Sequence, residues 1–184
     1  MKRSAPDTAV AAAPSASQRR ATGIAYLMQQ YGQIKPCEFG IAFDDMNGLK
    51  WNVAAQMPVL SQRLQDQLAA WSHIAQAPAE IVFEITFPKT FPTAHPFVRI
   101  VRPRFRYRTG HVTVGGSICT SLLTAQGWER MDIQSLLYSL VGILEEGGAV
   151  IQTSRDIHCT VPFVDYTEYE ARDAHRRMLQ VHGW

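Results

Sequence analysis

The stretch Gly-Gly-Ser-Ile-Cys at residues 115–119 carries more information about the fold and the chemistry than any other part of the chain. A glycine pair gives the backbone conformations that other residues rarely adopt. The cysteine that follows stands in an apolar setting, with Ile118 before it and Leu122-Leu123 after it. No helical or strand periodicity runs through the segment, so we expect Cys119 on an irregular part of the chain. Such a cysteine is either a buried apolar residue or a reactive thiol.

Alternating apolar residues around this segment predict four β-strands. The expected strands cover residues 39–43, 49–57, 81–87 and 97–101. The Asp-Asp-Met-Asn-Gly run at 44–48 predicts a turn that makes the first two strands a hairpin. The link from Pro88 to Pro96 is too rich in proline for a helix or a central strand.

Apolar residues at helical spacing predict four helices, over residues 18–31, 60–75, 133–144 and from 167 onward. Asp132 is placed to cap the third helix and Gly147-Gly148 to end it. Thr167 and Glu170 form a capping-box pattern at the start of the last helix. The inward face of that helix is predicted to hold Ala171, Ala174, Met178 and Val181.

The order of these elements predicts an α+β fold, a four-stranded antiparallel meander sheet flanked by helices. The chain has 184 residues, a length that suits one domain with a substantial core. Residues 1–17 are mostly alanine, serine and proline and are expected to be a disordered tail. Residues 18–184 are expected to form the folded domain.

Composition excludes several classes of protein and partner. The net charge is only +2, so electrostatics favour no nucleic acid or other charged partner. No apolar run approaches the roughly 18 residues needed to cross a bilayer, so no membrane association is expected. The three cysteines, Cys37, Cys119 and Cys159, are an odd number without metal-type spacing. They indicate a reducing compartment and no metal site.

The region from Phe87 to Trp128 resembles the active-site region of ubiquitin-conjugating enzymes, and in particular their Q-type branch. The resemblance rests on Phe-Pro-Lys-Thr-Phe-Pro at 87–92, on the glycine-cysteine stretch, and on Leu122-Leu123 with Trp128. The Q-type branch is indicated by Phe-Val-Arg-Ile-Val-Arg-Pro at 97–103, by Leu-Leu-Thr leading to Gln-Gly-Trp at 122–128, and by His-Gly-Trp at 182–184. The resemblance implies the ubiquitin-conjugating fold and a catalytic domain over residues 18–184.

For function, the resemblance implies that Cys119 accepts ubiquitin, or a ubiquitin-like protein, as a thioester from an activating enzyme. The cysteine then passes the acyl group to a nucleophile of a protein substrate, usually a lysine amine, with the help of a ubiquitin ligase. The family uses no metal and no organic cofactor. The implied location is cytoplasmic, nuclear or both.

The chain departs from the family pattern close to the cysteine. Where most members carry His-Pro-Asn, this sequence has Thr109-Gly110-His111. We therefore expect His111 to replace the asparagine as a catalytic residue beside Cys119, because imidazole can donate an N–H or act as a base. The family's acidic gate residue is not assigned, and the sequence leaves Glu145, Glu146 and Asp156 as possibilities.

The resemblance also implies docking positions for the activating enzyme and the ligase. The candidates are Arg19 and Arg20 on the first helix, Phe87 at the link, and Arg130 with Met131 in the loop after the cysteine. Phe87 also continues the alternating apolar face of its strand, which favours a place in the core equally well.

Two other functions are kept open at this point. The chain could be a catalytically silent variant of the same fold that binds ubiquitin or a partner, and the missing asparagine favours that alternative. It could instead be an unrelated cysteine hydrolase that pairs Cys119 with His95, His111 or His158.

Overall fold

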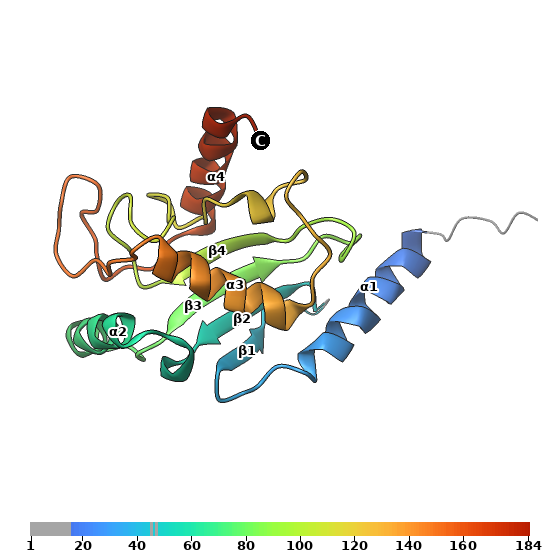
Figure 1. Cartoon of the computed structure of the whole chain (residues 1–184), viewed down its shortest axis with the longest axis horizontal. Helices are drawn as coiled ribbons and strands as arrows, with labels where there is room; N and C mark the ends of the chain where they lie inside the picture. Colours follow the sequence, from blue (N-terminus) through green and yellow to red (C-terminus); the bar gives the residue numbers. More distant parts are fainter. Residues whose placement is uncertain (1–15, 45, 47) are drawn as a thin grey trace, which may run out of the picture.

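The computed structural model describes residues 16–44, 46 and 48–184. The described elements are α1 (Ala16–Tyr31), β1 (Phe39–Phe43), β2 (Lys50–Ala55), the 3-10 turn η1 (Met57–Val59), α2 (Gln62–Ala75), β3 (Ile81–Thr86), β4 (Phe97–Arg102), the 3-10 turn η2 (Ser121–Leu123), α3 (Ile133–Glu146) and α4 (Glu168–His182) (Figure 1). Helix α1 begins at Ala16 rather than Gln18. Most of the tail predicted over 1–17, and two residues of the predicted turn at 44–48, lie outside the described residues.

The four strands form one antiparallel sheet in the order β1-β2-β3-β4, which confirms the predicted meander. β1 pairs with β2 from Phe39 opposite Ala55 to Phe43 opposite Trp51. The pairing of β2 with β3 and of β3 with β4 continues the same antiparallel order, with a register irregularity at Val82/Phe83. Strands that follow one another in sequence therefore lie side by side in the sheet, as short connections favour.

The core lies between one face of the sheet and α3, which crosses the strands in Figure 1. Side chains alternate across a strand, so every second residue of β2 and β3 points into this layer. The Asp132 side chain accepts a hydrogen bond from the Ser135 backbone N–H, which confirms the predicted cap of α3. The buried residues of this layer include Trp51, Val53, Ala55, Ile81, Phe83, Ile85, Leu136, Leu137, Leu140 and Leu144.

A buried ion pair on the opposite face of the sheet fixes the start of α4. The Arg99 guanidinium donates to both carboxylate oxygens of Glu84, at 2.8 and 2.7 Å. Its remaining nitrogen donates to the Tyr166 backbone carbonyl at 2.8 Å, two residues before α4 begins. Charges this deeply buried need such complete pairing. The sheet therefore holds the chain just before α4 in place.

Helix α4 has the predicted capping box, in which Thr167 and Glu170 satisfy each other's backbone N–H groups. Ala171, Ala174 and Met178 are buried, as predicted, but Val181 is 81% exposed, so its assignment to the inward face was wrong. Figure 1 shows the reason: the C-terminal end of α4 projects away from the sheet, beyond the part of the helix that the domain covers. No helix in the described part of the chain has the length and apolar character needed to cross a membrane.

Candidate active site

Cys119 ends an irregular segment that lies beside β4. Arg99 of β4 forms a bridge with Ser117, and Val112 forms a second bridge with Ile118. The Cys119 backbone N–H donates to the His111 carbonyl at 2.7 Å. Residues 111–119 thus fold back on themselves as a narrow loop. The prediction that Cys119 stands on an irregular stretch is confirmed.

The two glycines before the cysteine allow α4 to pack closely on this loop. A Cβ atom at Gly115 would lie 2.1 Å from the Glu170 carbonyl oxygen in the first turn of α4. A Cβ atom at Gly116 would lie 2.6 Å from the Tyr166 ring, and Gly116 also has a φ of +89°, which side chains disfavour. The glycine pair therefore couples the position of Cys119 to the position of α4.

We expect Gly115→Ala to destabilise the fold by about 1–3 kcal/mol, because the added methyl group overpacks a contact with rigid backbone. Gly142→Ala in α3 is the matched control, since a Cβ atom there meets nothing within 4 Å. That change should instead stabilise by about 0.5–1 kcal/mol, the usual gain of alanine over glycine inside a helix. Urea unfolding measures both changes. Equal stability of wild type and Gly115→Ala would show that α4 can move aside without cost.

The thiol of Cys119 faces a cavity of about 690 Å³. One wall comes from the loop that carries Tyr107, Arg108 and His111, and another from the last turns of α4, including Val181 and His182. Cys119 is half-buried, whereas Cys37 is exposed and Cys159 is buried. Among the three cysteines, Cys119 therefore combines partial exposure with a cavity beside its sulfur.

His182 is the side chain that the structure places against the thiol. Its Nε2 atom lies 3.5 Å from the Cys119 Sγ atom, although the two residues are 63 positions apart in sequence. The imidazole stacks on the Trp184 ring, with ring centres 4.6 Å apart and planes 20° apart. Gly183 makes this possible because it adopts a left-handed conformation, φ +69°, that turns the chain back at the end of α4.

Burial raises the pKa of the Cys119 thiol above its ordinary value. Removal from water disfavours the charged thiolate, and no neighbouring charge offsets this effect. The cysteine is therefore a neutral thiol at neutral pH and not half of a thiolate–imidazolium pair. Cysteine hydrolases need the opposite, a thiolate stabilised by an adjacent cation.

We expect the alkylation rate of Cys119 to reach half its maximum at a higher pH than that of an exposed cysteine, whose midpoint is at about pH 8.5. The measurement uses iodoacetamide on a Cys37→Ser, Cys159→Ser protein, so that one thiol reacts. Adding His182→Ala should leave the pH midpoint unchanged, because burial sets it. A midpoint below the ordinary value that rises in His182→Ala would instead indicate a hydrolase-type ion pair.

His111 lies in the same cavity, but its backbone is what contacts the cysteine. Its carbonyl accepts the Cys119 N–H, and its own φ is +54°, in the left-handed region. The ring is exposed and rests against Gly147, where an added Cβ atom would come within 2.6 Å of the ring Cδ2 atom. A catalytic role for the His111 ring stays a prediction.

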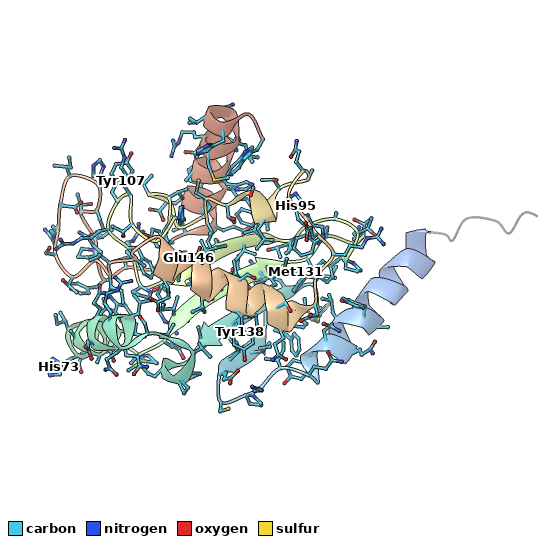
Figure 2. The ribbon with its side chains drawn as sticks, viewed as in Figure 1. His73, His95, Tyr107, Met131, Tyr138 and Glu146 are labelled. Atoms are coloured by element: carbon cyan, nitrogen blue, oxygen red, sulfur yellow. The ribbon has the colours of Figure 1, made fainter. Side chains whose placement is uncertain are left out.

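The other two histidines considered as partners of Cys119 lie in different places. His158 lines the cavity, with its ring 4.1 Å from the Tyr107 ring. His95 does not line it, and its Nδ1 atom lies 3.2 Å from the Pro96 carbonyl oxygen. In Figure 2, Tyr107 and His95 stand on opposite sides of α4.

None of the three acidic gate candidates lines the cavity. Glu145 accepts hydrogen bonds from the Ser61 N–H and hydroxyl at 2.9 and 2.7 Å, which fastens α3 to the start of α2. Asp156 accepts from the backbone of its own loop, at His158 and Cys159, and these bonds lower its pKa. Glu146 stands at the end of α3 (Figure 2). In the residues that the structure describes, no group of three or more His, Cys, Asp or Glu side chains could hold a metal ion.

The predicted docking residues lie in separate parts of the structure. Arg19 and Arg20 lie in α1, Arg130 is exposed, and Met131 is half-buried against the core. Phe87 is only 3% exposed, with its ring 5.1 Å from Trp51, so its proposed docking role is corrected to a core role.

Comparison with known proteins identifies the class of protein that this chain resembles. Over 93 residues it is 32% identical to ubiquitin-conjugating enzyme E2 Q1 of Mus musculus and of Homo sapiens, a match that covers 48% of the chain and 20% of each relative. Over 108 residues it is 33% identical to ubiquitin-conjugating enzyme E2 25 of Caenorhabditis elegans, which covers 56% of the chain and 26% of the relative. The chain thus spans about a fifth to a quarter of the length of these relatives. They confirm the resemblance to ubiquitin-conjugating enzymes, and the two Q1 proteins support the Q-type branch.

The fold is also similar to that of solved ubiquitin-conjugating enzymes. One is from Plasmodium falciparum, with 18% identity, a TM-score of 0.46, and coverage of 77% of this chain and 94% of that one. Another is human ubiquitin-conjugating enzyme E2 G1, with 20% identity, a TM-score of 0.49, and coverage of 67% and 95%. No protein-family model matches the chain.

Proposed function

We propose that this protein is a ubiquitin-conjugating enzyme that carries ubiquitin as a thioester on Cys119 and transfers it to a lysine amine of a protein substrate. The observation that carries the proposal is the half-buried thiol of Cys119 at the wall of a cavity, with His182 3.5 Å away. The sequence relatives, which are named ubiquitin-conjugating enzymes, support it. An accessible thiol favours an active carrier over a catalytically silent variant.

In the loading step, the Cys119 sulfur attacks the thioester carbonyl that joins ubiquitin to the activating enzyme. A new carbon–sulfur bond forms at Cys119, the old one breaks, and the Cys119 proton ends on the thiol of the activating enzyme. The exchange replaces one thioester by another of similar energy. It therefore does not need a cysteine with a strongly lowered pKa, which agrees with the neutral thiol described above.

In the discharge step, the acceptor amine attacks the carbonyl on Cys119. A carbon–nitrogen bond forms and the bond to sulfur breaks, so the amine must lose a proton while the sulfur gains one. The His182 imidazole stands next to that sulfur and can take the proton from the amine and return it to the thiolate. This assigns His182 as the general base and general acid of the transfer.

The test is incubation with an activating enzyme, ATP and ubiquitin, followed by electrophoresis with and without a thiol reductant. We expect a band larger by one ubiquitin that disappears under reduction. Parallel reactions with ubiquitin-like proteins and their own activating enzymes identify the modifier. No adduct with any of them would refute the carrier function and leave a binding role.

The proposal extends to partners and location. Arg19 and Arg20 in α1, and Arg130 with Met131 before α3, are proposed contacts for the activating enzyme and the ligase. We also propose a location in the cytoplasm, the nucleus or both, because the carrier thiol must stay reduced.

A further inference from the structure

The cavity beside Cys119 is lined by arginines, histidines, a tyrosine ring and apolar side chains. Arg108, Arg177, His111 and His158 reach it, together with the Tyr107 ring, and the residues that line it include no carboxylate. The lining also includes the apolar residues Val112, Val114, Ala174, Met178 and Val181. A cavity of about 690 Å³ lies within the range of about 300–1,000 Å³ that is usual for ligand sites.

The two arginines differ in how far their charge is already balanced. Arg108 is exposed, and no carboxylate in the described part of the chain lies within ion-pair distance of it. Arg177 pairs with Asp173 at 2.6 Å, and Arg176 shares the same carboxylate at 3.4 Å. One carboxylate, that of Asp173, therefore pairs with two guanidinium groups, and this group of three side chains keeps a net positive charge at the rim of the cavity.

The loop that presents Arg108 holds it in an uncommon backbone conformation. Arg108 has a φ of +61° and His111 a φ of +54°, both in the left-handed region, and Gly110 between them has a φ of +64°. Non-glycine residues in this region cost free energy, and such conformations concentrate at sites where they direct a side chain. Here both residues line the cavity that contains Cys119.

We propose that this cavity selects acceptor peptides in which an acidic side chain lies close to the nucleophile. A cavity that carries charge of one sign between low-dielectric walls concentrates ligands of the opposite sign. Guanidinium groups bind carboxylates through paired, charge-assisted hydrogen bonds. The apolar residues of the lining suit the aliphatic part of the acceptor's lysine and acidic side chains. This inference rests on the proposed transfer from Cys119 and adds the class of substrate.

A peptide fits the geometry better than a nucleic acid. The acceptor must bring its nucleophile to the carbonyl on Cys119, within the same cavity that holds Arg108 and Arg177. A net charge of +2 on the whole chain is too small to hold a polyanion by charge alone. An acidic side chain beside a lysine needs only the local charge.

The experiment measures the binding of two fluorescein-labelled peptides by fluorescence anisotropy at low and at moderate salt. Each peptide carries one lysine, flanked by glutamates in one and by glutamines in the other. We expect the glutamate peptide to bind about two- to fivefold more tightly, as one charge-assisted pair at an exposed site gives. Arg108→Ala and Arg177→Ala should each reduce this preference, and the double variant should abolish it.

Neighbouring arginines outside the cavity supply matched controls. Arg106 lies on the same loop as Arg108, and Arg176 lies on α4 beside Arg177, but neither Arg106 nor Arg176 lines the cavity. The control variants are Arg106→Ala and Arg176→Ala. Both variants should keep the preference. Equal binding of the two peptides, a preference that survives in the double variant, or an equal loss in the controls would overturn the inference. Tighter binding of a single-stranded oligonucleotide of the same charge would also overturn it.

The binding assay uses the uncharged protein, so its result does not depend on thioester formation. Discharge of the preformed thioester to the same two peptides then tests the link to catalysis, with the glutamate peptide expected to react faster at low peptide concentration. A protein that forms no thioester refutes the proposed function whatever it binds. A protein that forms a thioester but shows no preference in binding or discharge refutes only the acidic acceptor.

Discussion

Cys119→Ala is expected to abolish the reductant-sensitive ubiquitin adduct completely, because neither Cys37 nor Cys159 lines the cavity that holds His182. Cys37→Ser and Cys159→Ser should each keep the adduct. Cys37 is exposed but does not line this cavity and lies two residues before β1, and Cys159 is buried. The measurement is single-turnover loading followed by electrophoresis without reductant.

Cys119→Ser is an informative control for the same experiment. Its hydroxyl group should give an adduct that survives reduction, since an oxygen ester replaces the thioester. An adduct that persists in Cys119→Ala would contradict the assignment and direct attention to Cys37. Loss of the adduct in Cys159→Ser, with unfolding excluded by circular dichroism, would mean that the Cys159 thiol takes part in adduct formation as well as in core packing.

His182→Ala is expected to slow discharge of the preformed thioester by about two to four orders of magnitude, the usual contribution of a general acid–base group. Loading should change little, because thioester exchange moves no proton through the imidazole in the proposed mechanism. Free imidazole added to the buffer should partly restore discharge in His182→Ala. A purely structural role for His182 would not respond to imidazole.

His182→Gln separates position from proton transfer, because an amide fills similar space and cannot take up the proton. We expect it to discharge as slowly as His182→Ala. His111→Ala and His111→Asn belong in the same assay, since a loss restored by asparagine would assign His111 as a hydrogen-bond donor to the oxyanion. A strong effect of His111→Ala with no effect of His182→Ala would transfer the catalytic role from His182 to His111.

The sequence predicted the fold well because local patterns determine most of it. Period-two alternation in β2 and β3, the Asp132 cap and the Thr167–Glu170 capping box each depend on a few neighbouring residues, and all appear in the structure. The partner of the cysteine depends on a contact across 63 positions, and local patterns show which face of α4 a residue occupies but not what that face contacts.

A signal for His182 was nevertheless present in the helical spacing of α4. Ala174, Met178 and His182 follow one another at four-residue intervals and therefore lie on one face of the helix. The sequence analysis placed Val181 on that face instead, because it followed hydrophobicity rather than position. Phe87 is the converse case, since its alternation with Ile85 correctly indicated burial while the family resemblance suggested docking.

The position of His182 in the last turn of α4 also makes the proposed transfer depend on the local stability of that turn. Helix ends open locally at a much lower free-energy cost than the core, so this turn spends part of its time frayed. In the proposed mechanism, an acyl group on Cys119 would then have no adjacent base, because the imidazole would have left the sulfur. A partner that clamps residues 179–184 would lengthen the competent intervals and speed transfer without touching Cys119. In the proposed mechanism, the rate of transfer is then proportional to the fraction of time for which this helical turn is formed.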